Sequence, residues 1–220
     1  MNKIEKQVPR RWEEFVKAFP LTPEQKEQFQ TYAEMLLTEN KNINLTAITE
    51  PGGVVRHHFH DSLQLMNRID MNTITSIGDV GAGAGFPVLP LKIMFPHLRV
   101  LLIEMNGKKQ RFLRQVCAAL GLKDVEVAEY DWRTFLRVTE GEVDLFVSRA
   151  ALSTRELCRV FKPGSAYKKT TMVYWASINW EPESQIEKNV VVRWPYTLGS
   201  RDRVLAVLQG EQPQLTIRKN

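Results

Sequence analysis

The 220-residue sequence predicts an α/β protein with a mostly parallel seven-stranded sheet, helices on both faces and a helical extension at the N-terminus. From Ile74 onward, short apolar runs alternate with helix-like segments, which is typical of a parallel sheet. Closely spaced glycines lie between the first run and the next helix-like segment, as in nucleotide-binding folds. Only a short link, around residues 195–202, joins the last two runs, so we expect them to form an antiparallel hairpin at a sheet edge.

The first 70 residues have helical signals. Thr22 can cap a helix, Pro23 suits its first position and Gln25 completes a capping box. We expect a loop over 40–48 and a second helix over 54–68. The chain is therefore expected to form one compact unit, with a helical extension over 1–70 and a core over 71–220.

The core is expected to contain seven strands and five helices. The predicted strands are 74–80, 99–104, 124–128, 143–148, 171–176, 188–194 and 203–209. The predicted helices are 86–95, 107–120, 131–138, 152–161 and 182–187.

The glycine-rich segment after the first core strand indicates a ligand site. Gly81, Gly83 and Gly85 would let the backbone turn sharply and approach a ligand closely. The spacing differs from the G-x-G-x-x-G of dinucleotide sites, and the carboxylate of Asp79 would repel a pyrophosphate. S-adenosylmethionine, which carries a sulfonium and an amino group, suits this loop better than a nicotinamide dinucleotide. A glycine turn without a ligand is the alternative.

An acidic residue follows the second core strand. Glu104 ends the aliphatic run 100–103, about 20 residues after the glycine loop, where dinucleotide folds hold a ribose hydroxyl. A carboxylate accepts charge-assisted hydrogen bonds from a ribose diol. A solvated acid at a strand end is the alternative, but the pairing with the glycine loop favours ribose binding.

Composition indicates a compact protein of a reducing compartment. A hydrophobic content of 43% supports a core, and a net charge of +5 is compatible with a polyanionic partner. No apolar run is long enough to span a membrane, and no signal core is visible, so we expect a cytoplasmic protein. Cys117 and Cys158 are expected to be free thiols, and the histidines show no metal-ligand spacing.

Five short motifs together resemble one family. In chain order they are Asn44-Leu45-Thr46-Ala47-Ile48, His58-x-x-Asp61-Ser62-Leu63, Asp79-Val80-Gly81-Ala82-Gly83-Ala84-Gly85-Phe86-Pro87, Lys108-Lys109-x-Arg111-Phe112-Leu113 and Ser148-Arg149-Ala150. The series resembles the bacterial small-subunit ribosomal RNA guanine-N7 methyltransferase G family, also called glucose-inhibited division protein B. The resemblance covers about 29–208, and the series is far more specific than any single motif.

The resemblance implies a class I methyltransferase (Rossmann-like) fold, S-adenosyl-L-methionine as cofactor and ribosomal RNA or the small ribosomal subunit as partner. It also implies an adenine contact near Trp132 and Arg133 and a role for Arg149 at the reaction centre. The expected cofactor-binding residues are Asp79, Gly81, Gly83, Gly85, Phe86, Glu104, Trp132, Arg133 and Arg149. The expected RNA contacts are Lys108, Lys109, Arg111, Lys168, Lys169 and Arg203. We expect a monomer.

The implied acceptor needs no general base, because guanine N7 carries a lone pair and no proton. The chain departs from the family pattern over 131–134, where Asp-Trp-Arg-Thr replaces Arg-x-Glu-Glu, and at Val88, where a glycine is typical. It also lacks the usual Lys-Gly pair within 172–177. Two other functions remain open: a non-catalytic RNA-binding or ribosome-assembly protein, and a nicotinamide-dependent oxidoreductase.

Overall fold

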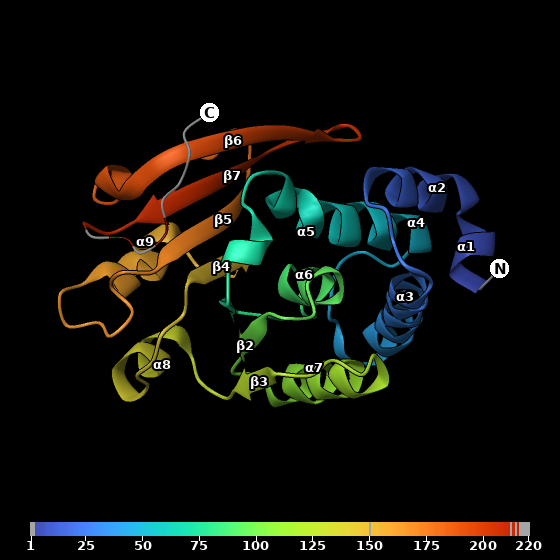
Figure 1. The fold of residues 1–220 in the computed structure, drawn as a ribbon, viewed down its shortest axis with the longest axis horizontal. Coiled ribbons are helices and arrows are strands. Elements are labelled where there is room, and N and C mark those ends of the chain that lie inside the picture. Colours follow the sequence, from blue (N-terminus) through green and yellow to red (C-terminus); the bar gives the residue numbers. More distant parts are fainter. Residues whose placement is uncertain (1–2, 150, 212, 214, 216–220) are drawn as a thin grey trace.

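A computed structural model describes residues 3–149, 151–211, 213 and 215. Ala150 of the Ser-Arg-Ala motif therefore lies outside the described residues. Seven strands are present: β1 (Ser76–Val80), β2 (Arg99–Ile103), β3 (Val125–Ala128), β4 (Leu145–Arg149), β5 (Thr171–Ser177), β6 (Val190–Leu198) and β7 (Arg201–Gln209). They form one sheet in the order β3-β2-β1-β4-β5-β7-β6 (Figure 1).

The strand directions confirm the predicted sheet. Strands β1 to β5 pair in parallel, and β7 runs antiparallel to both β5 and β6. The hairpin of β6 and β7 turns through only Gly199 and Ser200, so the link is shorter than expected and 195–198 belongs to β6. Gly199 has a φ of +66°, which suits a two-residue hairpin turn.

The helices of the N-terminal part precede the sheet. They are α1 (Lys3–Gln7), α2 (Pro9–Ala18), α3 (Pro23–Ile43), α4 (Pro51–Gly53), the π-helix η1 (Val54–His60), α5 (Asp61–Leu63) and the 3-10 turn η2 (Gln64–Asn67). The last four run on continuously, which confirms a helix over 54–68. The 3-10 turn η3 (Met71–Thr73) leads into β1.

The remaining helices connect the strands. They are α6 (Val88–Met94), α7 (Gly107–Ala119), α8 (Trp132–Val138), α9 (Thr154–Leu157) with the 3-10 turn η4 (Cys158–Phe161), and the 3-10 turn η5 (Glu187–Asn189). Both faces of the sheet are covered. Ile77 and Val147 join one hydrophobic cluster with residues of α2, α3, α6 and α7, and Val80 and Phe146 join another with residues of α8 and α9.

The capping box that predicts the start of α3 is present. The backbone N–H of Gln25 donates to Thr22 Oγ1 at 3.2 Å, and the N–H of Thr22 donates to Gln25 Oε1 at 2.9 Å. The expected loop over 40–48 begins late, since α3 continues to Ile43. The helix ends where Asn44 takes a left-handed conformation, with a φ of 48°.

Two predicted helices are wrong or incomplete. Residues 182–183 have no regular structure, 184–186 form a turn and Glu187 begins η5, so no α-helix is present there. The guanidinium of Arg193 binds the carbonyls of Ile178 and Trp180, at 3.3 and 2.6 Å, just before this segment. The helix expected over 152–161 is reduced to α9 and a 3-10 turn. The helix begins later than predicted because Ser153 caps it: its hydroxyl accepts a hydrogen bond from the Glu156 N–H at 3.3 Å.

Candidate cofactor pocket

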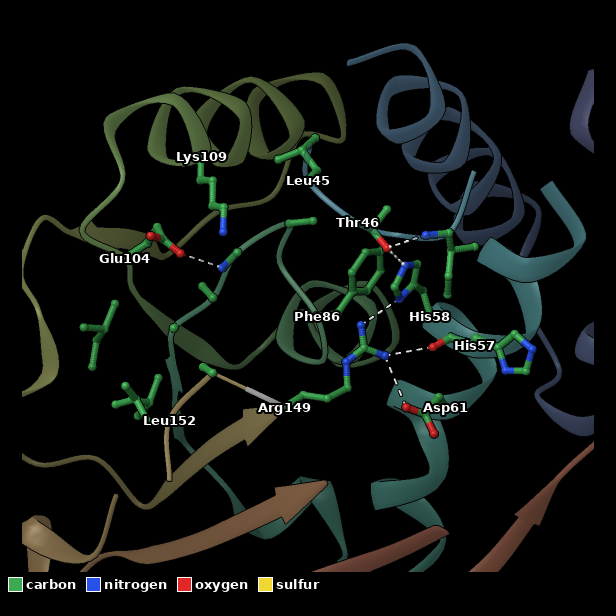
Figure 2. A pocket seen from close by; sticks show the side chains of 18 of the residues that line it. Leu45, Thr46, His57, His58, Asp61, Phe86, Glu104, Lys109, Arg149 and Leu152 are labelled. Atoms are coloured by element: carbon green, nitrogen blue, oxygen red, sulfur yellow. Dashed lines mark hydrogen bonds and ion pairs between the residues drawn. The ribbon is translucent and has the colours of Figure 1, made fainter. Parts of the chain in front are cut away.

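A pocket of about 590 Å³ opens at the carboxyl ends of β1, β2 and β4. This is the edge where open α/β sheets bind ligands. Figure 2 shows Glu104 on one side of the pocket, and Arg149, His58 and Asp61 on the other. The residues from the sequence prediction that line it are Gly81, Gly83, Phe86, Glu104, Trp132, Arg149, Lys109 and Arg203.

The glycine loop forms the floor between these two sides. The N–H groups of Gly81 and Ala82 both donate to the carbonyl of Ile103, at 2.9 and 3.1 Å, which ties the loop to the end of β2. Gly81 has a φ of +74°, and a Cβ there would come within 2.3 Å of the Cβ of Ala151. Only glycine therefore fits this position without displacing the loop.

Glu104 is fixed by the loop that it faces. Its Oε2 accepts a hydrogen bond from the Gly83 N–H at 2.9 Å, and its Oε1 accepts one from the Asn106 N–H at 2.9 Å. The side chain is largely buried, yet it lines the pocket. A carboxylate offers about four lone-pair sites, so these two bonds leave capacity for hydroxyl donors in the pocket.

Asp79 lies behind the loop and does not line the pocket. It is fully buried, and neither carboxylate oxygen has a hydrogen-bond partner among the residues described. Burial raises the pKa of Asp79 well above its usual value. The Arg149 charge and the nearby Val88 N–H oppose this rise, although that N–H does not reach hydrogen-bond geometry.

Arg149 ends β4 and is held by the helical run before β1. Its guanidinium donates to Asp61 Oδ2 at 3.2 Å, to the His57 carbonyl at 2.9 Å and to His58 Nδ1 at 2.7 Å (Figure 2). The π-helix η1 supplies the two acceptors from His57 and His58, and the first residue of α5 supplies Asp61; π-helical segments often occur at functional sites. Two of the five guanidinium donors, Nε–H and one Nη2–H, make no contact within the described structure.

Asp61 connects Arg149 to the distant hairpin. Its Oδ1 accepts a hydrogen bond from the Tyr196 hydroxyl at 2.6 Å and lies 3.1 Å from Nε of Arg203. Trp175 of β5 donates its indole N–H to the Asp61 carbonyl at 3.0 Å. In the sequence, Asp61 is visible only as part of the motif 58–63, and the motif predicts no role for it. The feature that could have identified Asp61 is an acidic residue within a largely apolar helical stretch.

Phe86 forms the wall beside the Arg149 cluster. Its ring stacks on His58 with centroids 4.3 Å apart and on Tyr32 with centroids 5.0 Å apart. The Arg149 guanidinium carbon lies 5.2 Å from the centre of the Phe86 ring. These stacked rings hold the aromatic wall in one orientation. Tyr32 belongs to α3, a helix in which the sequence predicted no site residue.

Only one of the two predicted adenine contacts, Trp132 and Arg133, lines the pocket. Trp132 lines the pocket, while its indole N–H donates to the Glu156 carbonyl at 3.0 Å and its ring packs on Phe135. Arg133 does not line the pocket: it is exposed and pairs with the Glu156 carboxylate at 2.7 Å. Gly85 also lies outside the lining, because it packs beneath Leu89 and Tyr32.

The predicted RNA contacts fall into three places. Lys109 points from α7 toward the glycine loop, and Arg203 lies beside Asp61, so both line the pocket (Figure 2). Lys108 and Arg111 are exposed on α7 outside the pocket. Lys168 and Lys169 line a separate groove.

The described part of the chain contains no helix long and apolar enough to cross a membrane. Within the same residues, no group of three His, Cys, Asp or Glu side chains is arranged to hold a metal ion. Cys117 and Cys158 are both free thiols, as expected.

The strand order, the glycine loop after β1 and the acid after β2 define a class I methyltransferase fold. A SAM-dependent methyltransferase from Aquifex aeolicus has a similar structure, with a TM-score of 0.50 and 16% identity over 71% of this chain and 93% of that one. Residues 25–191 match the family described as GidB, rRNA small subunit methyltransferase G. The chain belongs to this family.

Two relatives named Ribosomal RNA small subunit methyltransferase G illustrate the match. The one from Staphylococcus carnosus is 50% identical over 49% of this chain and 45% of its own length. The one from Geobacillus thermodenitrificans is 34% identical over 87% of this chain and 82% of its own length. The chain thus spans about half the length of the first relative and most of the second.

Proposed function

We propose that this chain is an S-adenosylmethionine-dependent methyltransferase that modifies guanine N7 in small-subunit ribosomal RNA. The observation that carries the proposal is the Glu104 carboxylate, fixed by the Gly83 N–H in the same pocket as Arg149. Family membership supports the RNA substrate and the cofactor. It also argues against the nicotinamide-dependent oxidoreductase.

The pocket residues fit the cofactor. Glu104 has remaining acceptor capacity for the two hydroxyls of a ribose. Trp132 and Ile103 supply apolar surface for an adenine, and the unused donors of Arg149 suit a carboxylate or a guanine oxygen. When bound, S-adenosylmethionine supplies an electrophilic methyl group.

The protein contributes position and not proton transfer. Guanine N7 offers a lone pair without a proton, so no side chain must act as a base. Arg149 and Phe86 together form a rigid wall that can orient a planar base, which is the role required for catalysis by proximity. Lys109 and Arg203 place positive charge at the pocket for the RNA backbone. We propose that the protein acts as a monomer.

The test is methyl transfer to ribosomal RNA, both free and in small subunits, taken from cells that lack the family enzyme. Labelled S-adenosylmethionine and mass mapping of nucleosides would identify the product. We expect 7-methylguanine at one position, and much less of it with the Glu104→Gln variant when S-adenosylmethionine is limiting. Cofactor and RNA binding without methyl transfer would instead support the non-catalytic assembly protein, which the missing Lys-Gly pair in 172–177 keeps as the second candidate.

A further inference from the structure

A second groove, of about 790 Å³, lies between α9, η4, the segment before β5 and the ends of the β6–β7 hairpin. We call it the amino-edge groove, because Lys168 and Lys169 precede the start of β5 and Gln209 ends the antiparallel β7. The cofactor pocket opens at the opposite, carboxyl edge. In Figure 1, α9 and the loop after it lie beside β5, far from α3 and α7.

The lining of the amino-edge groove is strongly basic. Two acidic side chains, Glu156 and Glu211, line it together with six basic ones: Arg155, Arg159, Lys162, Lys168, Lys169 and Lys188.

Internal pairing leaves most of this positive charge uncompensated. Glu156 is engaged by Arg133 and Arg159, at 2.7 and 2.8 Å. These two contacts lower the pKa of Glu156 to about 2, and the hydrogen bond from Arg133 has the larger effect. Glu156 therefore stays ionised and paired with these two arginines. In the part of the chain that the structure describes, no acidic side chain pairs with Arg155, Lys162 or the lysines of the groove. The groove therefore carries excess positive charge that suits an anionic partner.

One short segment of the chain connects the two sites, which lie at opposite edges of the sheet. Leu152 is on the rim of the cofactor pocket, and Arg155 lines the amino-edge groove three residues later. From there the groove reaches Lys168 and Lys169 at the start of β5. The seven residues of β5 span about 20 Å at roughly 3.3 Å each. An extended anion that leaves the cofactor pocket past Leu152 would thus meet positive charge along its path.

We propose that the amino-edge groove binds the phosphodiester backbone of the RNA strand that flanks the methylated base. Exposed lysines at spaced positions suit a repeating charge better than a single small anion, which fixed buried donors would hold. The inference rests on the proposed function for the identity of the RNA. It adds a second anchoring region about six nucleotides from the target base, at about 3.4 Å for each stacked nucleotide.

The test compares RNA binding by wild type with that of the Lys168→Glu/Lys169→Glu double variant. We expect the double variant to bind ribosomal RNA at least about 10-fold more weakly at moderate salt. Its slope of log affinity against log salt should be lower by about 1.4, or about 0.7 for each lost phosphate contact on a single strand. RNA fragments shorter than about six nucleotides cannot occupy both regions at once, so the double variant should lose less affinity for them than for longer RNA.

The matched control is Lys41→Glu/Lys123→Glu, which makes the same charge change at exposed lysines outside both pockets. Melting temperature and titration with S-adenosylmethionine check that each variant folds. Lys168→Gln/Lys169→Gln serves if charge reversal disturbs folding: it removes the same two phosphate contacts, so the salt slope should again fall by about 1.4, with a smaller loss of affinity. Arg155→Gln/Lys188→Gln tests the other wall of the groove.

The outcomes separate the two proposals. If wild type methylates the RNA while the groove variant and the control bind it equally well, the groove proposal is overturned and the proposed function stands. Weakened binding only to the assembled subunit, with naked RNA unaffected, would also overturn it in favour of a protein partner. If wild type transfers no methyl group to RNA, the proposed activity fails, whatever the groove binds.

Discussion

At the scale of single residues, His58 shows how the pocket fixes a protonation state. Arg149 has only N–H donors, so its 2.7 Å contact makes Nδ1 of His58 an acceptor. The proton of the neutral ring must then lie on Nε2, which donates to Thr46 Oγ1 at 2.8 Å. Burial, followed by the charges of Arg149 and His57, lowers the pKa of His58 to about 2.

This shift predicts a loss of stability in acid. His58 takes up a proton near pH 6.5 when unfolded but stays neutral when folded. The contribution of neutral His58 to the free energy of unfolding is therefore complete above pH 6.5. It is lost as the pH falls, by about 1.4 kcal/mol for each pH unit down toward pH 4. We expect urea unfolding to show a steeper acid decline for wild type than for His58→Asn. Equal slopes for the two proteins would contradict this account.

Glu104 makes a prediction about cofactor affinity. Glu104→Gln keeps the shape but removes the charge and turns one acceptor into a donor that faces the N–H of Gly83 or Asn106. A hydrogen bond to a charged group contributes about 1.5–3 kcal/mol, so S-adenosylmethionine should bind about 10- to 100-fold more weakly by calorimetry. Glu129→Gln is the control, since Glu129 is exposed and outside the pocket. Unchanged affinity in Glu104→Gln would remove it from the cofactor site.

At the scale of elements, the sequence predicts those features that local chemistry determines. The capping box of Thr22 and Gln25 and the antiparallel hairpin of the last two strands depend on neighbouring residues, and both appear as expected, although the link at Gly199 is shorter than the predicted 195–202. The connection that leads into 182–187 is instead held by Arg193 of a later strand, whose guanidinium binds the carbonyls of Ile178 and Trp180. Local propensity contains no information about such a contact, so the helix prediction fails there.

The same distinction explains the pocket. Gly81 and Glu104 follow strands directly, so the sheet brings them together and the spacing predicts this. Asp61 meets Arg149 and Tyr196 across 88 and 135 residues, and no periodic pattern links them. Arg133 lies in the first turn of α8 and not directly after a strand, and its side chain pairs with Glu156 outside the pocket.

Helix α3 supports the glycine loop through one hydrogen bond. The fully buried hydroxyl of Tyr32 donates to the Ala84 carbonyl, and the ring stacks on Phe86. Tyr32→Phe leaves that carbonyl unsatisfied and should lower the free energy of unfolding by about 1–3 kcal/mol. Because the carbonyl belongs to the loop, cofactor affinity should fall several-fold as well.

Tyr167→Phe separates the two effects of Tyr32. Tyr167 is also buried and donates to Thr139 at 3.0 Å, but it packs with Phe135 on the opposite face of the sheet. We expect this variant to lose stability and to keep its cofactor affinity, measured by thermal unfolding with and without S-adenosylmethionine. An equal loss of affinity in both variants would show that the effect is general and not specific to the loop.

At the scale of the whole molecule, the helical extension and the sheet share one core. The ring centroid of Phe15 in α2 lies 5.1 Å from that of Phe29, and the Phe29 centroid lies 4.9 Å from that of Phe59. The row of packed rings continues through Tyr32 to Phe86 beside the pocket. The same hydrophobic cluster includes the residues of β1 and α7 that face this side. The division into an extension over 1–70 and a core over 71–220 stays a prediction, and this packing suggests that neither part is independent.

A chain that begins at residue 71 tests that dependence. Without the extension, one face of the sheet would expose large apolar side chains that α2 and α3 cover, and Arg149 would lose Asp61 and His58. We expect the shortened chain to show no cooperative thermal unfolding and no binding of S-adenosylmethionine, and residues 1–70 supplied as a separate chain to restore both. A cooperative transition with cofactor binding in 71–220 alone would contradict this, because the sheet would then carry a complete core and pocket of its own.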